Sequence, residues 1–154
     1  MRNKQKGFSL IELLIVVAII LIIAAIAIPN LLRSKMAANE ASAVGSLRTI
    51  NTACAEYTNT YGTYPTTLVA LSPATPATST SADLIDSVLA AGTKSGYTFT
   101  YTPGTAVAGN IYSYTLAASP ITIGTTGQRG FFTTVSGVIR ADSSGTATAT
   151  STPI

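Results

Sequence analysis

Residues 1–30 read MRNKQKGFSLIELLIVVAIILIIAAIAIPN, and this stretch decides how the chain is built. A short basic stub, residues 1–7, precedes an apolar run from Phe8 to Ile28 that contains one acid, Glu12. A helix of that length extends about 31 Å at roughly 1.5 Å per residue, which matches the hydrocarbon thickness of a bilayer. The run therefore predicts a membrane-spanning helix. A carboxylate in such a helix costs on the order of 2.5 to 3.5 kcal/mol at mid-bilayer, so Glu12 indicates a function.

The apolar run does not fit a conventional secretory signal. Such a signal has an apolar stretch of roughly 7 to 15 residues and a small-residue cleavage site after it. Here the run is longer and continues without an A-x-A site into Pro29. The stub holds Arg2, Lys4 and Lys6 without an acid, so the positive-inside rule predicts a cytoplasmic N-terminus and a head outside.

The N-terminus resembles the signature of the type IV pilin superfamily over Lys6-Gly7-Phe8-Ser9-Leu10-Ile11-Glu12-Leu13-Leu14-Ile15-Val16-Val17. The resemblance implies that a prepilin peptidase cuts the Gly7-Phe8 bond and methylates the new amine of Phe8. A cut at this position removes the basic anchor and leaves the helix in the inner membrane. The subunit can then be extracted into a filament with its apolar segment intact.

The resemblance also implies roles for Glu12 and Pro29. The Glu12 carboxylate would pair with the N-terminal amine of an adjacent subunit, and a buried charge is tolerable only when it is paired, so the pair would select one axial register. The alternative is that Glu12 extends to the headgroups. Pro29 removes one helical hydrogen bond, so we expect a flexible joint there, either a local melting of the helix or a kink with helix on both sides.

The predicted fold class is α+β and pilin-like, with one long N-terminal α-helix packed against a three- to four-stranded antiparallel sheet. The predicted parts are a leader (1–7), a membrane helix and filament core (8–28), an amphipathic continuation (29–61), and a head (62–154) with an αβ-loop, the sheet and a low-complexity tail that frays. In the continuation an apolar stripe at spacings of three or four predicts the face that meets the sheet. Its members are Ala41, Val44, Leu47, Ile50, Cys54, Tyr57 and Tyr61, and we expect Glu40, Arg48, Asn51 and Glu56 to fall mostly off it.

The head shows one helix signal and four strand signals. Asp83 at the start and Gly92 at the end predict a short helix. Alternating residues predict strands at 97–102, 111–116, 131–135 and 138–141, the last two joined by a tight turn at Ser136-Gly137. We expect the aromatic rows Tyr97, Phe99 and Tyr101, and Tyr112 and Tyr114, to pack the core.

Composition argues against several classes of protein. Without the stub, six basic residues face six acidic ones, so the formal charge of +3 is no sign of nucleic-acid binding. Histidine is absent, which removes the commonest general base and metal ligand. Asp83, Asp86 and Asp142 lack a dense oxygen-ligand loop, so we expect no metal, no cofactor and no enzymatic activity. Cys54 is the single cysteine, so no intrachain disulfide can close the C-terminal region, as one does in many type IV pilins.

Three functions remain open at this stage. The first is a structural subunit of a type IV pilus or pilus-like filament, which is a homopolymer outside the cell. Its partners would be the prepilin peptidase, the inner-membrane assembly platform, related pilins and, before assembly, membrane lipid. The second is a pseudopilin of the type II secretion system, acting in a periplasmic pseudopilus, although the tail around Asp142 does not resemble the acid-rich calcium loop typical of major pseudopilins. The third is a tethered receptor or DNA-uptake factor, which the few basic residues of the head (Lys94, Arg129 and Arg140) disfavour.

Overall fold

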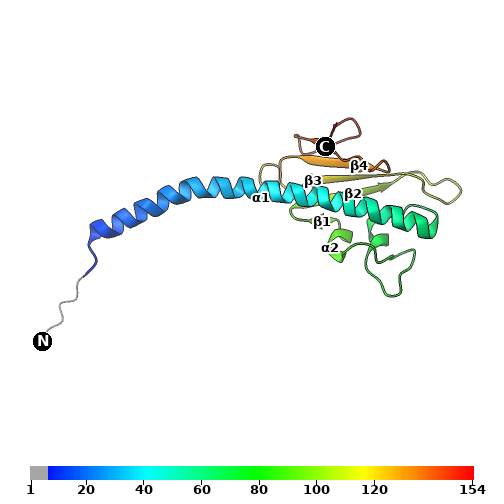
Figure 1. Ribbon diagram of the computed structural model, residues 1–154, viewed down its shortest axis with the longest axis horizontal. Helices are drawn as coiled ribbons and strands as arrows, with labels where there is room; N and C mark the ends of the chain where they lie inside the picture. The colour runs from blue at the N-terminus through cyan, green and yellow to red at the C-terminus, as the bar shows by residue number, and fades with distance from the viewer. Residues whose placement is uncertain (1–6) are drawn as a thin grey trace. The chain divides into compact units, whose positions relative to one another are not determined.

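The computed structural model describes residues 7–154, and the chain divides into two compact units after Ser34. One helix, α1 (Leu10–Tyr61), begins in the first unit and ends in the second (Figure 1). The first unit contributes only the apolar part of this helix and the segment before it. The second unit, Lys35–Ile154, holds the remainder of α1 and every other element.

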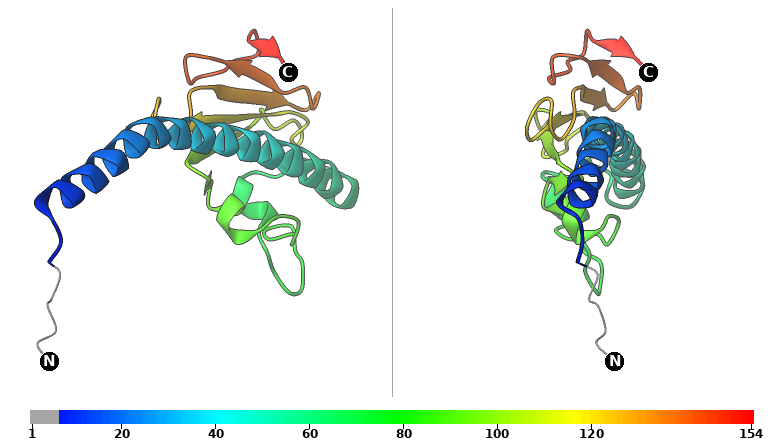
Figure 2. Two further views of the ribbon diagram at one scale, coloured as in Figure 1. Left: turned by 60° about the vertical axis from the view of Figure 1, so that its left-hand side comes forward. Right: turned by 90° about the vertical axis from the view of Figure 1, so that its left-hand side faces the viewer.

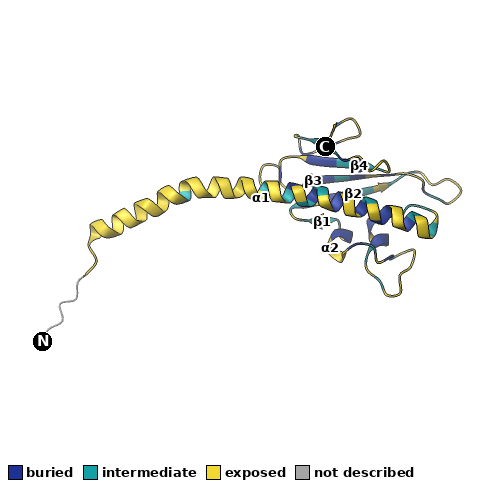
Figure 3. Cartoon of the chain, viewed as in Figure 1, coloured by how far each residue is buried: buried dark blue, intermediate teal, exposed yellow. Residues whose placement is uncertain are grey.

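The first unit is a helix without a covered face. Every residue from 7 to 34 is exposed except Ala24, which is half-buried (Figure 3). The helix continues through Pro29, so the structure has helix on both sides of the proline. Within the described residues, α1 is long and apolar enough to cross a membrane. This criterion uses length and composition alone, and a signal sequence also meets it.

In the second unit the rest of α1 lies across one face of a sheet (Figure 2). The predicted stripe is confirmed at its centre, because Leu47, Ile50 and Cys54 have no exposed surface. At its start the prediction was wrong: Ala41 is exposed, and the buried face begins instead at Glu40. The reason is tertiary, since the loop that precedes β4 donates hydrogen bonds from Gln128 and Arg129 to Glu40 and covers that side of the helix.

The sheet is a six-stranded antiparallel meander in the order β1-β2-β3-β4-β5-β6. Its strands are β1 (Thr93–Lys94), β2 (Tyr97–Pro103), β3 (Tyr114–Pro120), β4 (Gly130–Thr134), β5 (Arg140–Asp142) and β6 (Thr152–Pro153). The central pairing sets Tyr101 opposite Leu116 and Ala118 opposite Phe131. These side chains lie on the face toward α1 and form the core with it.

The predicted fold class is confirmed, with more strands than the three or four expected. The extra strands, β1 and β6, have two residues each and lie at the edges. The strand predicted at 111–116 begins later, so Tyr112 precedes β3 and is 61% exposed instead of packing beside Tyr114. The tail was expected to fray, but it returns to the sheet as β6, which pairs with β5, and it buries Ala147.

The connection after α1 holds a 3-10 helix, η1 (Leu68–Leu71), and a short helix, α2 (Ser87–Ala90). The prediction that α2 starts at Asp83 was wrong. Asp86 is the N-cap, and its carboxylate accepts a hydrogen bond from the Leu89 amide at 2.8 Å. Asp83 instead occupies a left-handed backbone position with φ of 56°, which a single turn residue adopts but a helix does not.

Four tyrosine hydroxyls in the core each donate to a polar group from another part of the head. The Tyr57 hydroxyl donates to the Ser79 carbonyl, that of Tyr97 to the Arg129 carbonyl, that of Tyr101 to the Pro65 carbonyl and that of Tyr114 to the Asn51 side chain. No buried side-chain polar atom among the described residues lacks a partner. Each of these tyrosines therefore combines a buried ring with a directional hydrogen bond from its hydroxyl. These bonds help to specify how α1, the loops and the sheet pack together.

Candidate functional site: the N-terminal processing and assembly segment

The start of α1 is closed by a capping box formed by Ser9 and Glu12. The Ser9 amide donates to Oε2 of Glu12 at 3.0 Å, and the Ile11 amide donates weakly to Oγ of Ser9 at 3.4 Å. The bond to Glu12 is the one that an S-x-x-E capping box forms, and the Ser9 hydroxyl accepts the second helical amide instead of the third, at a helix start where the first amides have no partner within the helix. The sequence analysis missed this role of Ser9, although the spacing before an apolar run was a sufficient signal.

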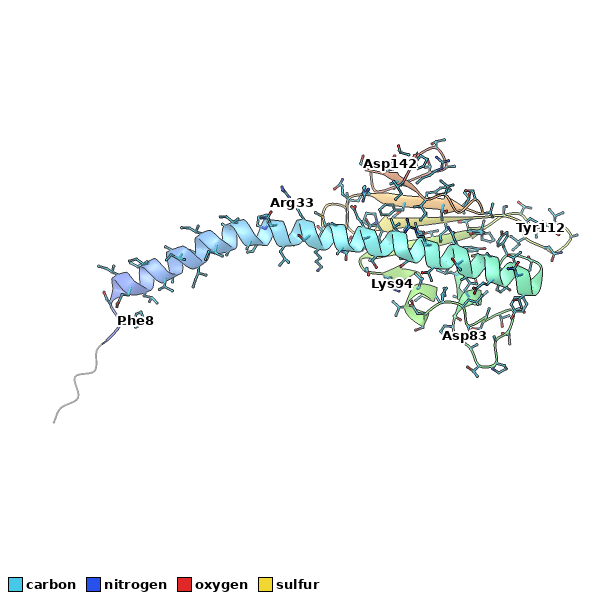
Figure 4. The ribbon with its side chains drawn as sticks, in the orientation of Figure 1. Phe8, Arg33, Asp83, Lys94, Tyr112 and Asp142 are labelled. Atoms are coloured by element: carbon cyan, nitrogen blue, oxygen red, sulfur yellow. The ribbon has the colours of Figure 1, made fainter. Side chains whose placement is uncertain are left out.

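The capping box separates the predicted cleavage point from the helix. Gly7 and Phe8 precede the first helical residue, and both are exposed, Phe8 by 81%. Figure 4 labels Phe8 at this end of the described chain. A protease needs a peptide bond free of helical hydrogen bonds, and the Gly7-Phe8 bond meets that condition. The basic residues predicted as the leader's anchor, Arg2, Lys4 and Lys6, lie outside the described residues.

Glu12 is the single charged residue between Gly7 and Leu32. Around it, seventeen large apolar side chains from Phe8 to Leu32 are exposed. A soluble monomer rarely exposes an apolar surface of more than a few hundred Å², so this helix requires either lipid or other protein around it. In such surroundings the Glu12 carboxylate is the side chain that most needs a partner. Within the described residues its hydrogen-bond partner is the Ser9 amide at the start of its own helix.

In the second unit, Glu40 forms a buried clasp that the sequence analysis missed. Oε1 accepts the amides of Gln128 and Arg129 at 2.9 and 3.0 Å, and Oε2 accepts Nε of Arg129 at 2.8 Å. Burial alone would raise the pKa of Glu40, but the amides of Gln128 and Arg129 and then the guanidinium outweigh it and hold the pKa below its usual value. A lone acid on a helix carries no sequence signal for a partner 88 residues away.

The head offers little cationic surface for nucleic acid. Of its three basic residues after α1, Arg129 is paired with Glu40, and Nζ of Lys94 lies 2.9 Å from Oδ2 of Asp86. Arg140 donates to the Ser151 carbonyl. Binding to a phosphate backbone needs several free cations in a row, which these residues do not form.

A cavity, the carboxylates and the single cysteine of the described head bear on its chemistry. A cavity of about 250 Å³ opens where β2 ends and β3 begins, lined by neutral side chains that include Thr102, Ser113, Tyr114 and Val135. Within residues 7–154 no group of three His, Cys, Asp or Glu side chains lies close enough together to hold a metal ion. Burial raises the pKa of the Cys54 thiol to about 12, so it stays protonated and unreactive at neutral pH.

Comparisons with known proteins agree with the N-terminal segment. Residues 2–28 match the prokaryotic N-terminal methylation motif. A major component of the type IV wide pilus of Thermus thermophilus is 65% identical over 40 residues, which cover 26% of this chain and 30% of that protein. The type II secretion system core protein G of Escherichia coli is 35% identical over 65 residues, covering 42% and 45%. A type IV major fimbrial protein of Dichelobacter nodosus is 49% identical over 57 residues, covering 35% and 36%.

The matched stretches span less than half the length of each of these relatives. No solved structure gives a significant match to the chain. A methylation motif, a long apolar helix and an antiparallel sheet packed on the end of that helix define a pilin-like protein. The motif and the relatives support its membership of the superfamily of type IV pilins and type II secretion pseudopilins, and both kinds occur among the relatives.

Proposed function

We propose that this chain is a structural subunit of a type IV pilus or pilus-like filament. A prepilin peptidase cuts the Gly7-Phe8 bond and methylates the amine of Phe8. The subunit waits in the bacterial inner membrane with its N-terminus on the cytoplasmic side, and an assembly platform then extracts it. Helices of neighbouring copies and of related pilins replace lipid around residues 8–28. The favourable free energy of this exchange comes from close packing of the helices rather than from leaving water.

One observation carries this proposal: a helix exposed on all sides, with one carboxylate at its capped start, within a stretch that matches an N-terminal methylation motif. In the uncut chain the Glu12 carboxylate accepts the Ser9 amide. Cutting at Gly7 creates an ammonium on Phe8 of each subunit, which is a stronger partner than a neutral amide. Pairing between the Phe8 ammonium of one copy and Glu12 of the next then fixes the axial register.

A pseudopilin of the type II secretion system is the second candidate function. The relatives include secretion system core protein G, which matches a longer stretch of this chain than the wide-pilus component does. The tail favours the pilus, because Asp142 is its single acid and bonds to the Ser144 amide at 2.8 Å instead of joining other carboxylates.

The test is electron microscopy of filaments sheared from the cell surface, with mass spectrometry of their subunit. We expect filaments outside the cell built from a chain that begins at a methylated Phe8. Confinement of the processed protein to the periplasm would favour the pseudopilin. A chain that keeps residues 1–7 and stays monomeric in the membrane would contradict both candidates.

Two substitutions at Glu12 separate its charge from its capping role. Glu12→Gln retains an oxygen that can accept the Ser9 amide, as glutamine does in capping boxes, whereas Glu12→Ala removes both the cap and the charge. We expect both variants to insert and both to lose ordered filaments. Normal filaments from Glu12→Gln would show that register does not depend on the charge.

A further inference from the structure

The face of α1 that points away from the sheet is uncovered in the second unit. Exposed residues recur on it every three or four positions from Ala41 to Thr60 (Figure 3). Three of them, Thr49, Thr52 and Thr60, each donate the hydroxyl hydrogen to the carbonyl four residues earlier, at 3.1 Å. Because these hydrogens already have partners, covering the face with another protein surface costs little desolvation.

Two charges of opposite sign lie on this face. Arg48 and Glu56 are the charged residues between Ala41 and Tyr61. Both are exposed, and neither belongs to an ion pair within residues 7–154. On an α-helix their separation in sequence amounts to about 12 Å along the axis at roughly 1.5 Å per residue, and to about 80° around it at roughly 100° per residue. The two charges therefore lie on opposite flanks of the face, with Thr52 midway between them.

A second copy of this chain is the partner that complements these two charges. One flank of the face carries a base and the other an acid, so a neighbouring copy can present its acid where this copy presents its base. When two such helices run parallel, a stagger of about 12 Å along the axis brings Arg48 of one copy level with Glu56 of the other. Each copy keeps one charge for a further neighbour, and head-to-tail contacts of this kind build open helical filaments when they do not close into a ring.

We propose that Arg48 of one subunit and Glu56 of a neighbouring subunit form an ion pair between the heads of the assembled filament. The inference rests on the proposed function, because it needs a filament in which the helices of neighbouring copies run parallel. This contact is separate from the pairing of Phe8 with Glu12 and fixes the axial stagger of the heads. A single exposed ion pair is weak, but this one repeats at every subunit.

The first experiment reverses each charge in the full chain and measures the filaments sheared from cells that assemble the unmodified chain. Arg48→Glu places two acids opposite each other and Glu56→Arg places two bases there, so each should lower the yield at least about twofold. The double variant restores the pair with its signs exchanged and should return the yield to that of the unmodified chain.

The matched control is Asp83→Asn. Asp83 is an exposed acid of the head that belongs to no ion pair within residues 7–154, and asparagine also adopts its left-handed backbone conformation. This variant should leave the filament yield unchanged. Tyrosine near-ultraviolet circular dichroism in detergent checks that every variant is folded, as expected for substitutions at exposed positions.

A second experiment locates the contact directly by cross-linking. Filaments of a chain that carries both Arg48→Cys and Glu56→Cys are treated with a short bismaleimide. Cys54 is fully buried, so the native thiol does not react in the folded head. We expect covalent dimers and longer ladders of subunits from the double variant and none from either single variant, because the contact joins unlike positions.

Three outcomes would overturn the inference. Filaments without cross-links from the double cysteine variant, or folded charge reversals with an unchanged yield, would remove the ion pair and leave the filament function intact. Cross-links from Arg48→Cys alone would show a symmetric contact between like positions instead of the head-to-tail pair. Absence of filaments from the unmodified chain would remove the proposed function and the ion pair together.

Discussion

At the residue scale, single polar side chains connect parts of the head that are distant in sequence. Glu40 on α1 accepts two amides and one guanidinium N–H from the loop before β4. Its own burial works against ionisation, and the hydrogen bonds reverse that effect. The clasp therefore stabilises the head only while the carboxylate is charged.

We predict that the head loses stability in acid through Glu40. Because the pKa of Glu40 is lower in the folded chain, the unfolded chain takes up the proton first, so the stabilisation is present above the unfolded value of about 4.3 and is lost as the pH falls below it. Glu40→Gln should lower the free energy of unfolding by about 1.5 to 3 kcal/mol at pH 7 and by less at pH 3. Urea titrations of the full chain in detergent, followed by tyrosine near-ultraviolet circular dichroism, measure this difference.

The matched control is Glu56→Gln. Glu56 is exposed on the same helix and belongs to no ion pair within residues 7–154. This variant should keep the wild-type stability and pH dependence. If Glu40→Gln instead kept the wild-type dependence on pH, the clasp would not be the source of the acid sensitivity.

Two glycines should respond in opposite directions to alanine. A β-carbon at Gly127 would overlap the Tyr97 ring, so Gly127→Ala should cost about 1 to 3 kcal/mol through overpacking. A β-carbon at Gly45 meets nothing within 4 Å, so Gly45→Ala should add about 0.5 to 1 kcal/mol from helix propensity. Thermal unfolding of both variants tests the pair, and a stable Gly127→Ala would show that the loop can move away from Tyr97.

At the scale of elements, α1 combines two kinds of helix surface in one continuous helix. Up to Ser34 its surface is uncovered, whereas from Glu40 to Tyr57 one face is buried against the sheet (Figure 3). Pro29 lies in the uncovered part, where no packing compensates for the missing amide. We therefore retain it as the proposed flexible joint, although the helix is continuous in the isolated chain.

Replacing this proline should stiffen the helix locally. In Pro29→Ala the new amide can donate to the Ala25 carbonyl, so amide hydrogen exchange near residues 25–30 should slow by at least about tenfold in micelles. The neighbouring variant Ile28→Ala adds no donor and should leave the exchange unchanged. Equal exchange in all three chains would contradict a joint at Pro29.

At the scale of the whole molecule, the C-terminal tail completes the head without a disulfide. Cys54 is buried in the core, so the closing element is β6, which pairs with β5, and the Ile154 amide donates to the Ile139 carbonyl at 3.0 Å. Before it, the backbone of Gly145 lies against Gly130 so closely that a side chain at Gly130 would collide with it. Packing and hydrogen bonds replace the covalent closure here.

Two truncations should therefore have different effects. Removing residues 152–154 deletes β6 alone and should cost about 1 kcal/mol, because few hydrogen bonds are lost. Removing residues 143–154 also uncovers the sheet beside Gly130 and should cost more than about 3 kcal/mol and promote aggregation through the exposed edge. Unfolding midpoints and light scattering measure both, and a tolerated loss of residues 143–154 would mean that the tail frays in solution.

Much of the architecture could be read from local patterns. Local periodicity in the sequence was enough to predict several elements, whatever their tertiary surroundings. These are the apolar run, the stripe at Leu47, Ile50 and Cys54, and the alternating strands at 97–102 and 131–135. The capping box of Ser9 and Glu12 was equally readable and was overlooked. Boundaries were less predictable, since the start of β3 depends on its pairing with β2, and α2 begins after Asp86 because that carboxylate, and not Asp83, caps the helix.

The sequence by itself determined that the chain has an apolar helix with one acid at its start, that this helix lies in a stretch matching a methylation motif, and that an antiparallel sheet follows, because these depend on residue spacing along one segment. Only the tertiary structure decided that Glu40 is a buried clasp and that the tail becomes β6. The physical reason is that each of these rests on contacts between segments far apart in the chain. Hydrogen bonds across such distances depend on the folded arrangement of the whole head and not on any single segment.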